Sequence, residues 1–122
     1  MVIFLDTYAI IAIDTKSDSY SKYNLDPEES VTTVFNLAEA YFVYLKKFGE
    51  KEADGMYDVV REMIIPIDDS VIKEAMKFKL ENTKKRLSFA DCIGYMAAIK
   101  LKAKFVTGDY AFKNFEGVEF IK

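Results

Sequence analysis

Residues 2–13 read VIFLDTYAIIAI, and this segment is the strongest indication of the fold. The first four residues are apolar and partly β-branched, as in a buried strand, and the apolar run after Asp6 indicates a helix that begins at once. KFVTGD, residues 104–109, is likewise typical of a strand and turn, and YAFKNF after it predicts a short helix. Two buried strands that each lead into a helix favour parallel pairing in one sheet.

The other segments complete an alternation of strands and helices. They predict a polar loop over residues 14–30, a short strand end over 30–33, helices over 34–49 and 50–63, an edge strand over 64–67, helices over 68–86 and 88–103, and a final strand over 118–121. This alternation indicates an α/β fold, with a central mostly parallel sheet and helices on both of its faces. We expect a single domain over residues 1–122.

The helix predicted over residues 34–49 is strongly amphipathic, and Gly49 ends it. We expect its apolar face to be the buried one. The side chains of that face are Val34, Leu37, Ala38, Tyr41, Phe42, Leu45 and Phe48.

The composition is that of a folded chain with few of the common catalytic groups. Of the 122 residues, 51% are hydrophobic and 30% are charged, and the net charge of −3 argues against a protein that coats nucleic acid through bulk positive charge. The chain has no histidine and one cysteine, Cys92. These counts exclude a Ser-His-Asp or Cys-His nucleophile, a histidine-ligated zinc and an internal disulfide. Catalysis must rest on carboxylates, lysines, tyrosines or hydroxyls.

The N-terminal residues have no pattern of a targeting signal. The apolar run over residues 2–5 is interrupted by Asp6, and no stretch approaches the roughly 18 apolar residues of a membrane span. We therefore expect a cytoplasmic protein that has no membrane partner.

Two aspartates follow the predicted strands directly, at the edge of the sheet where α/β proteins bind their ligands. Asp6 comes after VIFL, and Asp109 comes after KFVTG. Each also has a purely structural interpretation, because an aspartate between a strand and a helix is a good N-cap. Taken singly, each residue fits the capping interpretation better. For Asp91 the structural and the functional interpretations are equally good, since Ser88 and Asp91 fit a reciprocal capping box at the start of the helix predicted over 88–103.

Glu39 is the acid that favours a functional site. It lies in the middle of the helix predicted over 34–49, where no capping role exists, and at the edge of the apolar face beside Phe35 and Phe42. Partial burial of a lone carboxylate costs several kcal/mol unless a cation or hydrogen bonds compensate. A salt bridge to Lys46 is one such compensation, and a divalent metal shared with the three aspartates is the stronger interpretation.

A site of several carboxylates has a chemical consequence. The charges repel, raise at least one pKa and destabilise the fold unless a cation neutralises them. Oxygen ligands without histidine or thiolate favour Mg²⁺ or Mn²⁺ over zinc. Because Mg²⁺ keeps several waters, positions are left for a phosphate oxygen and an attacking water. We therefore hypothesise metal-dependent hydrolysis of phosphodiester bonds.

Four acidic motifs occur in order: LDTYAI with Asp6, TTVFNLAEAYF with Glu39, LSFADCIGYMAA with Asp91, and VTGDYAF with Asp109. Each is weak alone, but together they resemble a PIN domain, the nuclease fold of VapC-type toxins, over essentially the whole chain. The resemblance implies a three-layer fold and a Mg²⁺- or Mn²⁺-dependent endoribonuclease, usually a homodimer and often held in check by a cognate antitoxin. It also implies that the four acids bind the metal and that Thr7 and Thr107 supply supporting hydroxyls.

One position departs from the family's pattern. Family members often carry a further acid or Asn shortly after the fourth acidic residue, whereas Tyr110, Ala111 and Phe112 follow Asp109 here. We therefore expect one tightly held ion, with a second ion recruited together with the substrate.

Lys84, Lys85 and Arg86 lie just before the helix that carries Asp91. Basic residues beside a metal-filled acidic centre would attract RNA and make its binding sensitive to salt, so we predict these three as RNA contacts. The alternative is a solvated helix end, which explains each residue equally well.

Other functions fit the sequence less well. A haloacid-dehalogenase-type phosphatase needs a second acid two residues after its first aspartate, and Tyr8 occupies that position here. A receiver domain needs paired acids after its first strand, whereas the only such pair here lies in IIPIDD, far from that strand. Two alternatives stay open: a PIN-like RNA-processing nuclease outside a toxin–antitoxin system, and a non-catalytic module that binds protein or RNA.

Overall fold

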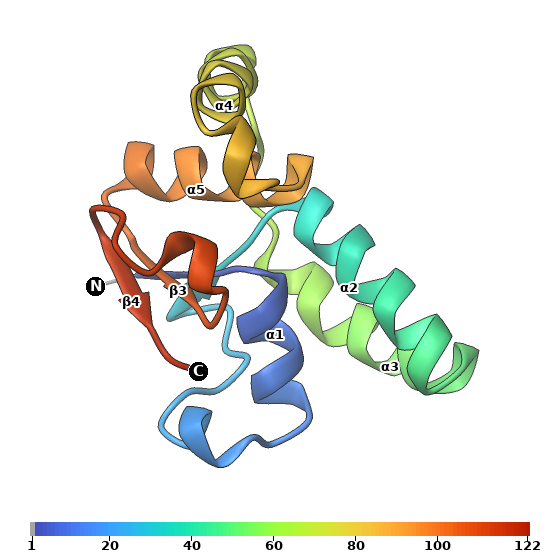
Figure 1. Cartoon of the computed structure of the whole chain (residues 1–122). Coiled ribbons are helices and arrows are strands. Elements are labelled where there is room, and N and C mark those ends of the chain that lie inside the picture. The colour runs from blue at the N-terminus through green and yellow to red at the C-terminus, as the bar shows by residue number, and fades with distance from the viewer. Residues whose placement is uncertain (1) are drawn as a thin grey trace.

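The computed structural model describes residues 2–122, and four parallel strands form its centre (Figure 1). The strands are β1 (Ile3–Leu5), β2 (Ser30–Val31), β3 (Lys104–Thr107) and β4 (Val118–Phe120), in the order β2-β1-β3-β4. Ile3 pairs with Ser30 on one side and with Lys104 on the other, and Phe105 pairs with Val118. The predicted parallel pairing of the first strand with the strand at residues 104–107 is confirmed.

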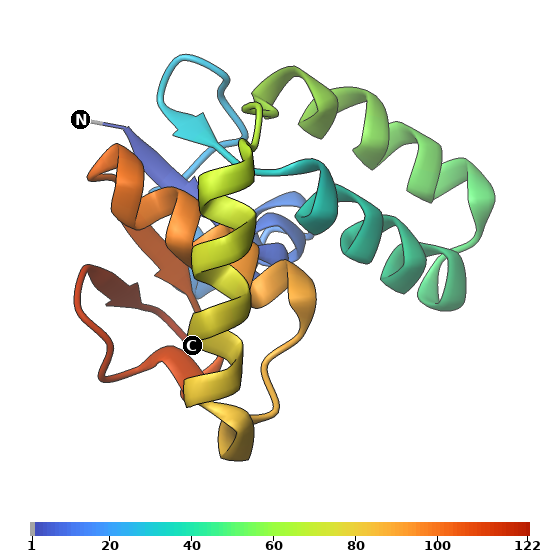
Figure 2. The same cartoon turned by 90° about the horizontal axis from the view of Figure 1, so that it is seen from above.

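Helices cover both faces of this sheet (Figures 1 and 2). They are α1 (Thr7–Asp14), α2 (Val34–Lys47), α3 (Glu50–Val60), α4 (Asp69–Glu81) and α5 (Phe89–Leu101), with short 3₁₀ helices η1 (Asp18–Tyr20), η2 (Arg61–Met63), η3 (Thr83–Lys85) and η4 (Tyr110–Phe112). α1, α2 and α3 lie on one face, and α4 and α5 lie on the other. This is the predicted three-layer fold. Within residues 2–122, no helix is long and apolar enough to cross a membrane.

The strands β1 and β3 contribute side chains to two hydrophobic cores, because successive residues of a strand point to opposite faces of the sheet. Phe4 and Phe105 lie in the core beneath α4 and α5, and their rings stack with centroids 5.5 Å apart. Leu5 and Val106 lie in the core beneath α1, α2 and α3. Burial on both faces explains why these two strands are apolar at successive positions.

Side chains at the helix N-termini fix where α1 and α5 begin. Asp6 accepts a hydrogen bond from the backbone N–H of Ala9 at 2.9 Å. Ser88 and Asp91 form the predicted capping box: Ser88 N lies 2.8 Å from Asp91 Oδ2, and Asp91 N lies 3.0 Å from Ser88 Oγ. Such a cap stabilises a helix by about 1 kcal/mol. The structural interpretations of Asp6 and Asp91 are therefore correct, and any further role must be compatible with them.

The strand predicted over residues 64–67 is absent. Ile64 forms a single parallel bridge with Thr32, and Ile65 N donates to the carbonyl of Thr32 at 3.0 Å. The next residue, Pro66, has no N–H with which to extend a ladder. The segment runs beside β2 without adding a fifth strand.

The buried face of α2 also differs from the prediction. Of the predicted apolar face only Leu37 is buried, while Phe42 is 59% exposed. The buried side chains are Asn36, Leu37, Ala40 and Tyr44. α2 packs against α1, α3 and α5, and these contacts select a stripe that contains a polar residue, which a count of apolar side chains cannot anticipate.

Candidate active site

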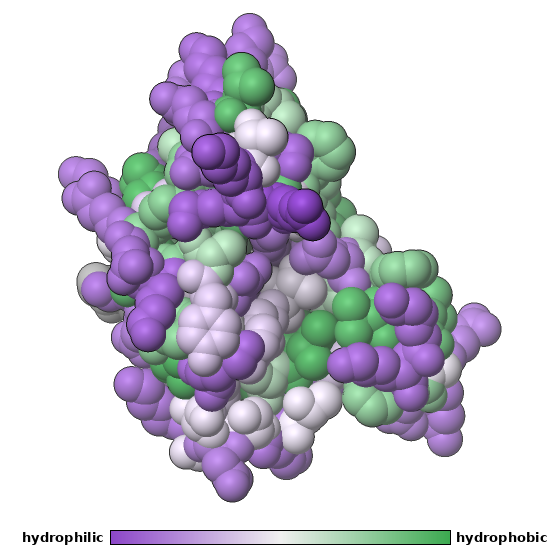
Figure 3. Space-filling model, in the orientation of Figure 1, coloured by the Kyte–Doolittle hydropathy of each residue, from purple (hydrophilic) through white to green (hydrophobic). Residues whose placement is uncertain are grey.

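One cleft, with a volume of about 540 Å³, opens where β1 and β3 end. It brings together all four acids predicted from the sequence: Asp6, Glu39, Asp91 and Asp109. Its other lining residues are Thr7, Tyr8, Ile11, Val43, Arg86, Ser88, Gly108, Tyr110 and Lys122. Figure 3 shows the molecule hollowed between η4 and α2, with hydrophobic surface over α2 at the side of the hollow. The acids come from four separate segments, so only the fold assembles them.

Asp6 is the most buried of the four acids, with 2% of its surface exposed. Its Oδ1 accepts the hydrogen bond from Ala9 N, and its Oδ2 accepts one from the hydroxyl of Thr107. Burial above all, together with the nearby charges of Asp91 and Asp109, raises the pKa of this carboxyl from 3.8 to about 7 against the opposing effect of the two hydrogen bonds. The ionised form of Asp6 is therefore costly in the absence of a cation.

The turn after β3 holds Asp109 next to Asp6. The hydroxyl of Thr107 donates to Asp6 and accepts from the backbone N–H of Asp109 at 3.0 Å, so a single side chain links the two acids. Gly108 between them has no room for a side chain: a Cβ there would lie 2.6 Å from the carbonyl oxygen of Ile121 and would collide with the ring of Tyr8. A larger residue at position 108 would therefore displace the neighbouring backbone or the ring of Tyr8.

Asp91 and Glu39 form the helical side of the cleft, and both are half-buried. Burial raises the pKa of Asp91, and the charges of Glu39 and Asp109 act in the same direction. Glu39 makes no salt bridge with any residue in the range 2–122. Lys46, the alternative partner predicted from the sequence, instead lies with its Nζ 4.8 Å from the ring centroid of Phe42.

The donor set of the cleft is compatible with a hard divalent cation. Within residues 2–122, no three Asp, Glu, His or Cys side chains lie close enough together to enclose an ion by themselves. Mg²⁺ commonly binds through one or two carboxylates and keeps several waters, so it does not require such a cluster. The oxygen donors and the raised pKa of Asp6 fit an ion of this kind. They do not fit an ion held by protein ligands alone.

Thr7 lies in the cleft wall, and its hydroxyl accepts a hydrogen bond from Asn36 Nδ2 at 3.2 Å. Asn36 is fully buried, and its Oδ1 accepts from the hydroxyl of Thr33 at 2.7 Å. The absence of a side chain on Gly94 makes room for this amide, since a Cβ there would lie 3.0 Å from Asn36 Oδ1. Asn36 was not among the residues predicted for the site. Its signal was a polar residue one helical turn before Glu39, on the side of α2 that the fold buries.

The predicted RNA contacts lie in different places. Arg86 lines the cleft, whereas Lys84 and Lys85 do not, and Lys85 Nζ lies 5.1 Å from the ring centroid of Phe115. Arg86 has a left-handed backbone, with φ of 55°, directly after η3. Lys122, which the sequence analysis did not single out, also lines the cleft.

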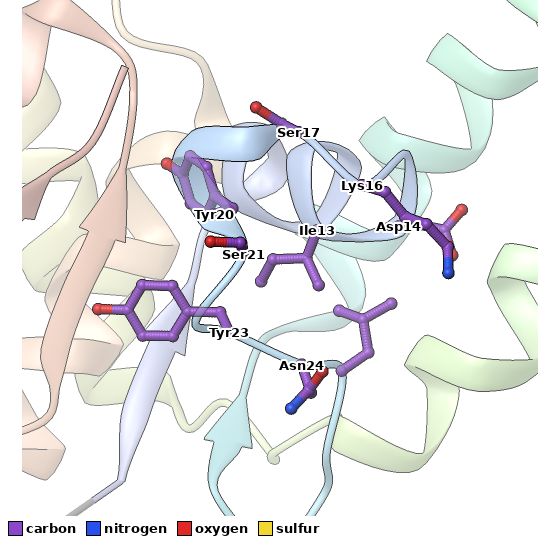
Figure 4. A pocket seen from close by; sticks show the side chains of 9 residues that line it. Ile13, Asp14, Lys16, Ser17, Tyr20, Ser21, Tyr23 and Asn24 are labelled. Carbon is purple, nitrogen blue, oxygen red and sulfur yellow. The ribbon is translucent and has the colours of Figure 1, made fainter.

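A second cavity, of about 430 Å³, lies beside the segment over residues 13–25 and contains none of the predicted site residues (Figure 4). Tyr20 and Tyr23 line it and hold this segment against the end of the chain. Tyr20 donates its hydroxyl to the carbonyl of Ile121 at 2.8 Å, and Tyr23 donates to Glu119. These bonds give the tyrosines a structural role.

The family model for the PIN domain matches residues 3–118. The chain therefore belongs to the PIN domain family, as its four acidic motifs and its three-layer fold indicate. No curated protein matches the sequence significantly.

Three solved structures have a similar fold. A chain of a toxin–antitoxin complex from Klebsiella pneumoniae has a TM-score of 0.72 at 16% identity, over 96% of this chain and 95% of that one. A chain of VapBC2 from Rickettsia felis, bound to a DNA fragment from the promoter, has a TM-score of 0.72 at 21% identity, over 100% of both chains. A chain of VapBC-5 from Mycobacterium tuberculosis, of the VapBC family of toxin–antitoxin systems, has a TM-score of 0.61 at 20% identity, over 99% and 98%. At these identities the similarity establishes the fold.

Proposed function

We propose that this protein is a metal-dependent endoribonuclease, the toxin of a toxin–antitoxin pair, in a single nuclease domain over residues 1–122. Its proposed catalytic and metal-binding residues are Asp6, Glu39, Asp91 and Asp109. The observation that carries the proposal is that these four acids, distant along the chain, line one cleft at the ends of β1 and β3. Membership of the PIN domain family supports it independently.

In the proposed hydrolysis of RNA, the acidic, polar and basic side chains of the site have different roles. Mg²⁺ or Mn²⁺ bound here would supply positive charge for the phosphate and would lower the pKa of a water molecule. The four carboxylates would hold the ion, in part through its bound waters, and the hydroxyl of Thr107 orients Asp6. Asn36 fixes Thr7 and the first turn of α2, the helix that carries Glu39. Arg86 contacts a phosphate oxygen of the RNA, and Lys84 and Lys85 contact phosphates farther along the strand.

The proposed partners follow from the same function. The three similar structures come from toxin–antitoxin systems by their names, which supports a cognate antitoxin for this chain. A homodimer is proposed from the resemblance to the VapC-type family. We also propose a cytoplasmic location for the protein.

Cleavage of RNA under matched metal conditions tests the activity. Wild-type protein and the Asp6→Asn variant are incubated with RNA in Mg²⁺, in Mn²⁺ and in EDTA, with Asp58→Asn as a control for loss of an exposed acid on α3. We expect wild type and the control to cleave only with metal. We expect Asp6→Asn to lose at least about a hundredfold in rate, since several kcal/mol of charge stabilisation depend on the ion. Identical traces in all conditions would refute the nuclease function.

Metal binding is measured separately from activity by calorimetric titration with Mn²⁺. We expect binding to wild type and Asp58→Asn and a large loss of affinity in Asp6→Asn and Asp91→Asn. Equal Mn²⁺ affinity in all four proteins would show that these carboxylates are not the ligands.

A further inference from the structure

Tyr110 is the most exposed aromatic residue of the cleft, with 61% of its surface open. It follows Asp109 directly and begins η4. A single exposed aromatic residue is common on protein surfaces and by itself indicates nothing. Its surroundings carry the inference.

The ring of Tyr110 is held in place by neighbours from the end of the chain. The ring of Phe120 lies beside it, with centroids 5.1 Å apart and 41° between the planes. Lys122 Nζ lies 4.7 Å from the ring centroid of Tyr110 and 5.1 Å from that of Tyr8. A ring that is already ordered loses little conformational entropy when a ligand packs on it. We call Tyr8, Tyr110 and Lys122 the stacking rim.

The cations of the cleft lack carboxylate partners in the part of the chain that the structure describes. Lys122 Nζ contacts the carbonyl of Gly108 at 3.4 Å. Neither Lys122 nor Arg86 makes a salt bridge with residues 2–122. An ammonium group has three donors, so Lys122 keeps N–H groups for an incoming anion. The cleft thus combines acids along its walls with an aromatic ring and free positive charges beside them.

We propose that the stacking rim binds one unpaired nucleotide of the RNA, with its base stacked on Tyr110 and an adjacent phosphate on Lys122. Stacking on a side chain requires a base with a free face, and RNA recognition of this kind uses single-stranded loops, bulges and ends. This inference rests on the proposed ribonuclease function and deepens it.

The test measures binding in EDTA, so that cleavage does not interfere. The probes are a short single-stranded oligouridine with one 2-aminopurine, whose fluorescence reports stacking, and a blunt RNA duplex of equal length. The proteins are wild type, Tyr110→Leu, which keeps an apolar side chain against Phe120, and Tyr110→Phe, which keeps the ring. Tyr57→Leu on α3 is the control for loss of an exposed tyrosine outside the cleft.

We expect Tyr110→Leu to lower the affinity for the single strand about tenfold and to abolish the fluorescence change, because one stacked base is lost. Tyr110→Phe and Tyr57→Leu should behave as wild type, and the four proteins should bind the duplex equally. Wild-type affinity of Tyr110→Leu for the single strand would overturn the proposal. An equal loss for single strand and duplex would also overturn it.

Salt dependence tests the phosphate contact. Lys122→Gln should reduce the slope of log K against log salt for the single strand by about 0.7, the value for one phosphate contact. Lys51→Gln, which removes the same charge from the exposed face of α3, should leave the slope unchanged. Equal slopes for Lys122→Gln and Lys51→Gln would remove Lys122 from the proposed site.

The two proposals can fail separately. A Tyr110-dependent fluorescence change without metal-dependent cleavage by wild type would leave the stacking rim intact and refute the nuclease. Metal-dependent cleavage without any effect of Tyr110→Leu on binding would refute the stacking rim alone.

Discussion

Asp6 on the strand side of the cleft and Glu39 on the helical side lie in contrasting environments. On the strand side, Asp6 is almost fully buried, accepts hydrogen bonds from Ala9 N and Thr107, and has its pKa raised to about 7. On the helical side, Glu39 is half-buried in the middle of α2 and makes no salt bridge within residues 2–122. Asp91 lies between these extremes, with one oxygen in the capping box.

This contrast separates acids that also serve the fold from an acid that does not. Asp6, Asp91 and Asp109 each accept a hydrogen bond from a backbone N–H, so their presence has a structural reason. Glu39 has no such reason. We therefore expect substitution of Asp6, or of its partner Thr107, to change stability strongly, and substitution of Glu39 to change it hardly at all.

The largest expected effect on stability is that of Asp6→Asn in metal-free protein. The pKa of Asp6 is 3.8 without the fold and about 7 in it, so the unfolded chain releases the proton first as pH rises. The contribution of Asp6 to the free energy of unfolding therefore falls between about pH 4 and pH 7 and is level above, and a shift of this size corresponds to roughly 4 kcal/mol. At pH 8 in EDTA, Asp6→Asn should be more stable than wild type by up to that amount.

Urea unfolding at pH 4, 6 and 8 measures this difference. At pH 4 the two proteins should be nearly equal, because the carboxyl is then protonated in both states. A stability difference that is the same at all three pH values would contradict the buried, proton-binding environment assigned to Asp6.

Thr107→Val should have the next largest effect, a loss of about 2 kcal/mol at pH 8. The substitution removes the donor to the ionised carboxylate of Asp6 and the acceptor of Asp109 N. The loss should be smaller at pH 5, where Asp6 is mostly protonated. Thr83→Val, which removes an exposed hydroxyl bonded to the carbonyl of Leu80, is the control and should change little at either pH. An equal cost for both variants would contradict the special role of Thr107.

Ser88→Ala should lower the free energy of unfolding by about 1 kcal/mol, the value of one N-cap. It removes the acceptor of Asp91 N at the start of α5. Ser19→Ala in η1, whose serine is exposed, should stay within about 0.5 kcal/mol of wild type. Thermal or urea unfolding of the three proteins tests whether the capping box in fact stabilises α5.

Glu39→Gln should change stability least, by no more than about 0.5 kcal/mol, because its carboxylate loses no salt bridge to any residue of the range 2–122. Under the proposed function it should nevertheless abolish most of the RNA cleavage. Glu81→Gln at the end of α4 removes an equal charge outside the cleft and should keep full activity. Destabilisation by Glu39→Gln of several kcal/mol would show that Glu39 serves the fold after all.

Local sequence rules predicted the elements near the cleft well. The strands over residues 2–5 and 104–107 and the cap at Asp6 depend on neighbours within a few residues, and all are confirmed. The four acidic motifs were also found in order, and the structure brings them to one cleft. Patterns of this range are visible in a single sequence because the interactions that produce them are local.

The predictions that were wrong depend on contacts between segments that are distant in the sequence. Residues 64–67 have the composition of a strand, but only Ile64 meets a partner, Thr32. The apolar side of α2 is exposed at Phe42, and the amide of Asn36 is buried because Thr33 and Thr7 satisfy it. The residues near Asn36 in the sequence do not indicate that Thr7 is its hydrogen-bond partner.

Composition and periodicity thus settled the α/β class, the helix starts and which residue types were available for chemistry, since each of these depends on local backbone preferences and on solvation. The depth of Asp6, the link through Thr107 to Asp109 and the approach of Lys122 to Tyr110 required the folded chain. Asp6 and Thr107 meet although they lie 101 positions apart in the sequence. The electrostatic cost of a carboxylate depends on every charge and dipole that the fold brings near it.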